Sequence, residues 1–362
     1  MTDQSLTDLE IEEQAPIEAV EFRGLSYPFG RWWPAPGELK EVAAGVLWLR
    51  MPMPAGLDHI NLYVLDDGDG WVLVDTGLRT DETRALWQGL LAGPLGGKPV
   101  TRVIVTHMHP DHLGQAGWLC RHTGATLCMT RGEYLTARML MLDQQEEPPV
   151  EAMTFYGRAG WDGEDLEAFR GRGWGRFGNA VTPLPVQYHR MRDDDALTIG
   201  GRTWRVVVGR GHSPEHACLV CEEAGVLIAG DQVLPRITPN VSVHVAEFDA
   251  NPLEEWFDSL DRLKLLPDSL LVLPSHNEPF HGLHARLDQL RLDHERKLDR
   301  LIERCREPRK VRETFETLFK RPITNSDIMM ATGEALSHLH YLEGQGRLRR
   351  QREADHDLFV VP

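Results

Sequence analysis

The sequence predicts an α/β fold followed by a smaller, mainly helical domain. Short apolar runs typical of buried strands alternate with amphipathic helical segments between residues 45 and 282. From residue 283 onward, apolar residues instead recur at helical spacing among many charges. A chain of 362 residues also exceeds a comfortable single-core domain. We therefore expect one large domain over residues 40–282 and a second domain over residues 283–362.

Strand and helix signals alternate at the start of the large domain. Residues 45–54 and 60–77 contain apolar runs, and the turn sequence DDGDG divides the second run as in a hairpin. Residues 80–93 have an acidic first turn and leucines on one face, which predicts a helix. Residues 99–105 predict a buried strand, and residues 111–124 predict a helix that ends at glycine. The turn between these two elements is a position at which α/β proteins commonly bind ligands.

The alternation stops between residues 131 and 192, which we interpret as an insertion over the active-site side. A predicted helix at 131–145 is followed by a segment rich in glycine, arginine and aromatic residues without a sustained period. Its aromatic side chains either line a hydrophobic entrance or pack the insertion itself, and the sequence leaves both readings open: Trp161, Trp174, Phe177 and Tyr188.

Sheet signals resume after the insertion and then give way to helices. Residues 196–213 and 216–231 each predict a hairpin, and residues 269–279 predict a final strand. The segments 283–306, 310–320 and 325–346 predict three helices, and residues 347–362 predict a terminal hairpin. Three helices followed by a hairpin indicate a winged-helix-like domain at 283–362.

Charge is distributed unevenly along the chain. Acidic residues outnumber basic residues by 55 to 39, but residues 283–362 contain 16 basic and 14 acidic residues. The preceding 282 residues are therefore strongly acidic and would repel nucleic acid, which makes it a disfavoured partner. Residues 1–22 predict an acidic, disordered tail without the features of a targeting signal. Five scattered cysteines and the lack of a long apolar stretch predict a soluble cytoplasmic protein with reduced thiols and no membrane association.

The sequence THMHPDH at residues 106–112 concentrates three histidines and one aspartate after a predicted strand. His107 and His109 can point to the same side of a tight turn, while the following helical turn directs Asp111 and His112 to an adjacent position. Two metal sites therefore fit this loop better than one. Three later strand ends offer completing ligands: His212, Asp231 and His276. Seven nitrogen and oxygen ligands suit two divalent metal ions with room left for water.

Five motifs occur in order along the chain: VDTG (74–77), THMHPDH (106–112), GHSPEH (211–216), AGD (229–231) and PSHNEP (274–279). Together they resemble the metallo-β-lactamase superfamily, and within it the glyoxalase-II-like and lactamase-like hydrolases. The resemblance implies a four-layer αβ/βα sandwich over residues 40–282. Ser213, Glu215 and the SHN sequence depart from the usual GHTPGH and GHG motifs without removing a ligand.

The resemblance also implies a role for each candidate residue. The first metal would be held by His107, His109 and His212, the second by Asp111, His112 and His276, and Asp231 would bridge them. Asp75 would orient the ligands from outside the coordination sphere. Zinc is the expected metal, and iron or manganese would accept the same ligands.

This ligand set predicts a metal-dependent hydrolase. Two divalent ions, two aspartates and one hydroxide leave a net positive charge, so the centre can hold a hydroxide near neutral pH and polarise a substrate oxygen. We expect a metal-bridging hydroxide to attack the carbonyl of a small ester, thioester or lactone. The resemblance assigns Asp111 the catalytic role of orienting this hydroxide and receiving a proton.

Two other functions remain open. A winged-helix-like domain after such a catalytic domain is similar to the arrangement in lactamase-like ribonucleases, where it would hold RNA, although the acidic catalytic domain opposes this. A non-enzymatic metal-sensing or DNA-binding protein is the third hypothesis, and the complete ligand set opposes it. The sequence also allows a homo-oligomer.

Three weaker patterns have structural explanations that we favour. His59 and Asn61 lie on a strand and are expected in the surface or core rather than at the substrate. Cys218 and Cys221 are spaced like a redox or zinc pair, but a strand directs them to opposite faces, so core packing is expected. A run of arginines is expected to form a solvated hairpin face rather than a nucleic-acid patch: Arg347, Arg349, Arg350 and Arg352.

Overall fold

The computed structural model describes residues 18–54, 57–324 and 327–362. Most of the predicted acidic tail, residues 1–17, therefore lies outside the described residues. The tail prediction extended too far, because Val20–Phe22 forms strand β1, which pairs with β2 (Leu25–Tyr27). The side chains of Leu25 and Tyr27 are buried in a hydrophobic core, which anchors this hairpin to the domain.

The first of two large sheets has seven strands in sequence order, from β3 to β9. Its strands are β3 (Lys40–Ala43), β4 (Val46–Pro52), β5 (His59–Asp66), β6 (Trp71–Val74), β7 (Val100–Ile104), β8 (Thr126–Thr130) and β9 (His189–Met191). Pairing is antiparallel from β3 to β6 and parallel from β6 to β9. Helices α1 (Asp81–Ala92), α3 (Ala116–Thr123) and α4 (Arg131–Leu142) pack on its outer face.

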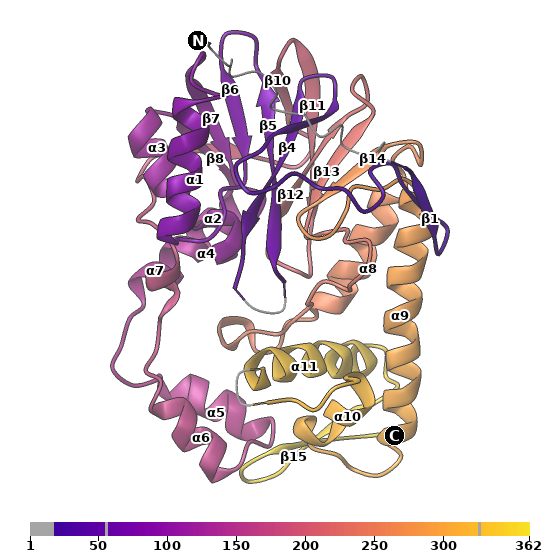
Figure 1. Ribbon diagram of the computed structural model, residues 1–362. Coiled ribbons are helices and arrows are strands. Elements are labelled where there is room, and N and C mark those ends of the chain that lie inside the picture. Colours follow the sequence, from indigo (N-terminus) through magenta and orange to yellow (C-terminus); the bar gives the residue numbers. More distant parts are fainter. Residues whose placement is uncertain (1–17, 55–56, 325–326) are drawn as a thin grey trace, which may run out of the picture.

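The second sheet has five strands, from β10 to β14. They are β10 (Ala196–Ile199), β11 (Arg202–Gly209), β12 (His216–Cys221), β13 (Val226–Gly230) and β14 (Leu271–Pro274), and only the β13–β14 pair is parallel. Helices α8 (Pro252–Leu263) and α9 (Leu283–Arg304) cover the outer face of this sheet. The two sheets pack face to face, so the order of layers is helix, sheet, sheet, helix (Figure 1). The predicted four-layer sandwich is confirmed.

The cores on the two sides of the second sheet explain the cysteine pair. Cys221 belongs to the core between the sheets, whereas Cys218 belongs to the core beneath the outer helices. Both side chains are fully buried, so their spacing reflects strand alternation rather than a redox or metal pair.

The C-terminal region is helical and ends in a hairpin. After α9 come the short helices η2 (Val311–Thr314) and α10 (Phe315–Leu318), then α11 (Ile328–Gly344) and the hairpin β15 (Arg349–Arg352) and β16 (Asp357–Val360). The helix expected over residues 310–320 is thus broken into two short turns. Helix α9 runs from the second sheet into this region and joins both parts (Figure 1).

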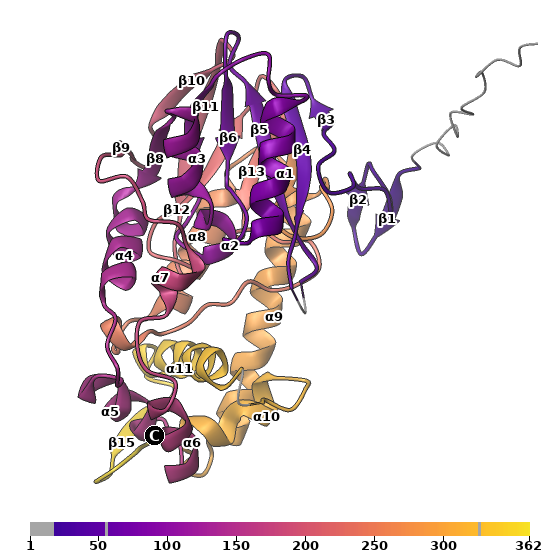
Figure 2. The same ribbon diagram turned by 60° about the vertical axis from the view of Figure 1, so that its left-hand side comes forward.

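The insertion packs against the C-terminal region. Its helices α5 (Val150–Arg158) and α6 (Gly163–Arg170) lie beside η2 and the β15–β16 hairpin, and α7 (Phe177–Ala180) leads back toward the first sheet (Figure 2). The indole of Trp161 donates to Thr332 Oγ1 at 2.9 Å, and Arg158 pairs with Asp357 at 2.9 Å. The other three aromatic residues singled out above also pack against hydrophobic cores. Packing therefore accounts for these side chains.

Three of the four arginines in the run at residues 347–352 are paired with acids, and the first of them, Arg347, contacts Asp299. Arg350 contacts Glu343 and Asp249, and Arg352 contacts Asp357. These ion pairs agree with a solvated hairpin face. Within the part of the chain that the structure describes, no helix is both long and apolar enough to cross a membrane.

Candidate metal centre

The candidate ligands meet at one edge of the sandwich, where several strands end. The loop 105–112 follows β7, Asp231 follows β13 and His276 follows β14, while His212 lies between β11 and β12. Pro110 begins the one-turn helix α2 (Pro110–Leu113), which carries the two later ligands of the loop. This turn separates Asp111 and His112 from the two histidines that precede it.

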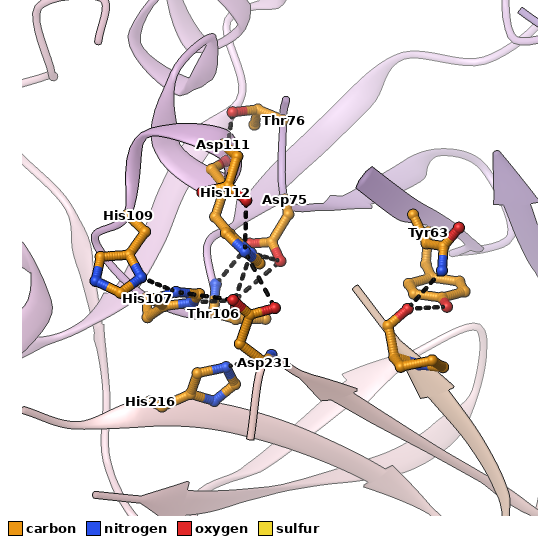
Figure 3. A network of polar contacts seen from close by, with 12 residues as sticks. Tyr63, Asp75, Thr76, Thr106, His107, His109, Asp111, His112, His216 and Asp231 are labelled. Atoms are coloured by element: carbon orange, nitrogen blue, oxygen red, sulfur yellow. Dashed lines mark hydrogen bonds and ion pairs between the residues drawn. The ribbon is translucent and has the colours of Figure 1, made fainter. Parts of the chain in front are cut away.

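The first cluster contains His107, His109, His212 and Asp231. His107 Nε2 lies 2.9 Å from His109 Nδ1 and 3.3 Å from His212 Nε2. Asp231 Oδ2 lies 3.4 Å from His212 Nε2 and 3.9 Å from His107 Nε2. Four donor atoms from three loops therefore converge on one point. Figure 3 shows three of these residues, His107, His109 and Asp231.

The second cluster contains Asp111, His112, His276 and the other oxygen of Asp231. His112 Nε2 lies 3.5 Å from both Asp111 Oδ2 and Asp231 Oδ1. His276 Nε2 lies 3.4 Å and 3.5 Å from the same two oxygens. Asp231 thus faces both clusters, one carboxylate oxygen toward each.

These separations fit metal coordination. Ligands about 2.0–2.2 Å from a tetrahedral ion are separated by roughly 3.3–3.6 Å, close to most of the distances in both clusters. His112 Nε2 and Asp231 Oδ1 are buried and have no hydrogen-bond partner in the protein. A buried polar atom without a partner is costly, and a bound cation would satisfy both atoms. The donor set therefore suits divalent metal ions.

In four of the five candidate histidine ligands, Nδ1 is held by an acceptor, which leaves Nε2 free for a metal; His109 instead turns Nδ1 toward the cluster. His112 Nδ1 lies 2.8 Å from Asp75 Oδ2, and His107 Nδ1 lies 3.1 Å from Thr106 Oγ1. His212 Nδ1 lies 2.7 Å from the carbonyl oxygen of Asn240, and His276 Nδ1 lies 3.0 Å from that of His59. Such contacts fix the tautomer and the ring orientation.

Asp75 connects the centre to the first sheet. Besides contacting His112, its carboxylate accepts from the backbone N–H of Thr106 at 2.8 Å and from the Thr106 hydroxyl at 2.9 Å. Its backbone has φ of 63°, a left-handed conformation that a non-glycine residue rarely adopts. The strain is consistent with a position determined by these contacts.

Burial sets the charge states in the metal-free protein. Burial lowers the pKa of His109 to about 3, and burial with four neighbouring histidines holds the pKa of His107 well below its ordinary value. Burial alone would raise the pKa of Asp231, but His276 and His112 outweigh it and hold the pKa well below its usual range. At neutral pH His107 and His109 are therefore neutral imidazoles and Asp231 is a carboxylate, the forms that bind metal.

Sequence reasoning missed Glu133, a fully buried carboxylate at the start of α4. It accepts from the backbone N–H of Met108 at 2.9 Å, from that of Glu215 at 2.7 Å and from the Ser213 hydroxyl at 2.7 Å. Glu133 therefore clamps the loop of His109 to the loop of His212. Ser213, which stands where the usual GHTPGH motif has threonine, supplies one of these donors.

His216 was quoted in a motif but given no role. It is fully buried, its ring stacks on His107 with centroids 4.7 Å apart, and its Nε2 accepts from the backbone N–H of Asp231 at 3.1 Å. A Cβ atom at Gly230 would lie 2.4 Å from the same Nε2. Glycine is therefore required beside this ring, which explains the middle residue of the AGD motif.

Asn61 has a core role, as favoured above, but one tied to the centre. Its side-chain oxygen accepts from Trp48 Nε1 and Arg50 Nε at 2.9 and 3.0 Å. Its amide donates to the carbonyls of Pro274 and Asn277 at 2.9 and 2.6 Å. Asn61 therefore holds both ends of the turn that carries His276.

Comparison with known proteins agrees with this geometry. Residues 55–276 match the family model of the metallo-beta-lactamase superfamily, and residues 298–359 match that of a metallo-beta-lactamase-like C-terminal domain. A crystal structure of a beta-lactamase domain protein from Burkholderia ambifaria has 40% sequence identity and a TM-score of 0.85, covering 93% of this chain and 98% of that one.

Curated relatives are more distant. "Probable metallo-hydrolase YqjP" of Bacillus subtilis is 24% identical, over 83% of this chain and 92% of its own length. An atrochrysone carboxyl ACP thioesterase of Aspergillus fumigatus is 22% identical, over 80% of this chain and 53% of its own. The acyl-coenzyme A thioesterase MBLAC2 of Gallus gallus is 26% identical, over 54% and 65%. With its fold, its paired His/Asp clusters and these matches, the chain belongs to the metallo-β-lactamase superfamily and is a hydrolase of that family.

Proposed function

We propose that this hydrolase holds two divalent metal ions, most readily zinc, and cleaves a small ester, thioester or lactone at the carbonyl carbon. The observation that supports this most strongly is the pair of four-atom clusters that share Asp231. His107, His109 and His212 would hold one ion, and Asp111, His112 and His276 the other. Two such ions would supply a nucleophilic water at neutral pH and polarise the substrate carbonyl.

Asp111 is the residue best placed to move a proton. Its side chain retains 15% exposure, more than the other carboxylate of the centre, Asp231, at 10%. Its Oδ2 faces His112 and His276, and its remaining oxygen is free to orient the attacking water and to accept the proton that it loses. Asp231 is more deeply buried and is committed to both clusters.

The thioester is the substrate class that the comparisons favour. Two of the relatives described above are named as thioesterases, one for an acyl carrier protein and one for coenzyme A. A thiolate leaves more readily than an alkoxide, so the centre needs less help from a general acid. This suits a site in which the protein side chains closest to the metals are all ligands.

Turnover of a substrate panel by protein of known metal content tests the proposal. The panel contains an acyl-coenzyme A, a glutathione thioester, a lactone, a β-lactam, a phosphodiester and a short single-stranded RNA. We expect hydrolysis of carbonyl compounds only, loss with a chelator and recovery with zinc. Cleavage of RNA instead would favour the ribonuclease alternative.

The variant Asp111→Ala tests the assigned role. We expect at least a hundredfold loss of turnover with little change in folding, because the side chain is partly exposed and lies outside the hydrophobic cores that hold the two sheets together. Far-ultraviolet circular dichroism and metal content serve as controls. An active, fully metallated variant would refute the role of Asp111.

A further inference from the structure

The C-terminal region contacts the segment that orients one of the candidate ligands. His212 Nδ1 lies 2.7 Å from the carbonyl oxygen of Asn240, which belongs to the connection between β13 and α8. The side-chain amide of Asn240 donates to Glu334 Oε2 at 3.2 Å. Glu334 lies on α11 and accepts from Lys297 of α9 at 2.7 Å. A continuous chain of polar contacts therefore runs from the C-terminal helices to His212.

Close packing fixes the same segment on α11. The backbone N–H of Val243 donates to the carbonyl of Gly333 at 3.0 Å. A Cβ atom at Gly333 would lie 2.8 Å from both Ser242 Cβ and Val243 O, so the segment lies directly on the helix. Ser242 Oγ also donates to Asn240 Oδ1 at 2.5 Å, which holds the amide in the orientation that reaches Glu334.

A second helix secures the beginning of this connection. Arg286 of α9 donates to the carbonyl oxygen of Ile237 at 2.8 Å and also to that of Leu234. The position of the Asn240 carbonyl is thus set by two helices outside the β-sandwich. A main-chain acceptor can orient a ligand only if the path of its segment is fixed, and here those helices fix it.

We infer that Glu334 is a positioning residue for the first metal site and acts through Asn240 and His212. The C-terminal region then completes the centre rather than serving only as an appended domain. The inference rests on the proposed metal-binding function of the first cluster. It does not depend on the identity of the substrate.

Zinc binding to apo-protein, measured by competition with a chromophoric chelator, tests the inference without using activity. Changes to outer contacts of ligating histidines typically weaken metal binding about 10–100-fold. Because Glu334 acts two contacts away, we expect Glu334→Ala to weaken one of two zinc equivalents about tenfold and to leave the other unchanged. Asn240→Asp should give the same loss, since it replaces the amide donor with a like charge facing Glu334 while leaving the helices intact.

Two controls separate positioning from general destabilisation. Arg158→Ala removes another ion pair of the C-terminal region, the one with Asp357, and should leave both zinc affinities unchanged. In a His212→Ala background, Glu334→Ala should have no further effect on zinc affinity, because the residue through which it acts is absent.

Unchanged zinc affinity in both Glu334→Ala and Asn240→Asp would overturn the inference, as would the same loss in Arg158→Ala or in the His212→Ala background. Wild-type protein that binds no zinc would overturn it together with the proposed function. Two zinc equivalents without turnover of any panel substrate would refute only the proposed reaction.

Discussion

Replacing Glu133 with glutamine is expected to destabilise the metal-free protein by about 2–3 kcal/mol. The carboxylate accepts three hydrogen bonds, two from backbone N–H groups and one from a hydroxyl. Glutamine has one acceptor oxygen at its end, so its amide nitrogen must face the N–H of either Met108 or Glu215. One buried donor is then left without an acceptor, which costs about 1–3 kcal/mol.

Loss of the negative charge at position 133 has two opposite effects on the free energy of unfolding. The remaining bonds to Glu133 become neutral ones, and each loses about 0.5–1.5 kcal/mol. Against this, the pKa of Glu133 is raised by burial, which outweighs its hydrogen bonds, so replacing the carboxylate removes a desolvation penalty. The two effects largely offset one another, and the unpaired N–H dominates the net cost.

Urea unfolding of chelator-treated protein at pH 7 measures this cost. Ser213→Ala is the matched control, because it removes one donor and leaves the carboxylate with both backbone donors. We expect it to cost about 1 kcal/mol. If Glu133→Gln costs no more than Ser213→Ala, the group does not act as an ionised clamp between the two ligand loops and the reasoning is refuted.

Three further perturbations have expected outcomes that depend on single contacts. Asn61→Ala should lower the free energy of unfolding by about 2–4 kcal/mol, because two buried donors lose their acceptor. It should also weaken zinc binding by the second cluster. An unchanged melting temperature would contradict this expectation. Gly230→Ala should cost at least about 2 kcal/mol more than Gly225→Ala. Both glycines have positive φ, but only the first would contact a ring, so equal costs would show that the His216 contact is unimportant. Burial lowers the pKa of His338 to about 4, so the folded state binds fewer protons than the unfolded state and stability is lost as pH falls from about 6.5 toward 4. At pH 5.5 this effect lowers the free energy of unfolding by about 1 kcal/mol. Urea unfolding at pH 7.5 and 5.5 should show this decrease in the wild-type protein and not in His338→Gln. The same pH dependence in both proteins would contradict the assignment.

Local patterns predicted most strands of the sandwich, because these are short apolar runs that end at a turn. Strands β3, β8 and β9 were not predicted, and β9 lies within the segment that we interpreted as an insertion. The convergence of the seven candidate ligand residues was also predictable, since they follow strands and consist of side chains that bind metal. The β1–β2 hairpin and the break at residues 310–320 were not predictable. Leu25 and Tyr27 of β2, and Val311 and Phe315, are buried in a core built from segments far away in the sequence. Glu133 gave no local signal, as its three donors come from loops 25 and about 80 residues away.

The four histidines whose Nδ1 is held by an acceptor show which contacts of the centre can be predicted from sequence and which cannot. Asp75 and Thr106 hold two of the rings with side chains, and a motif records such residues. The rings of His212 and His276 are held by main-chain carbonyls, which every residue possesses and no motif records. The position of a carbonyl depends on the path of its segment and hence on what the segment packs against. For His276 the path is set within the sandwich by Asn61, whereas for His212 it is set by the helices α9 and α11. On our inference, a change in the C-terminal region therefore weakens metal binding by the first cluster and leaves the second cluster intact.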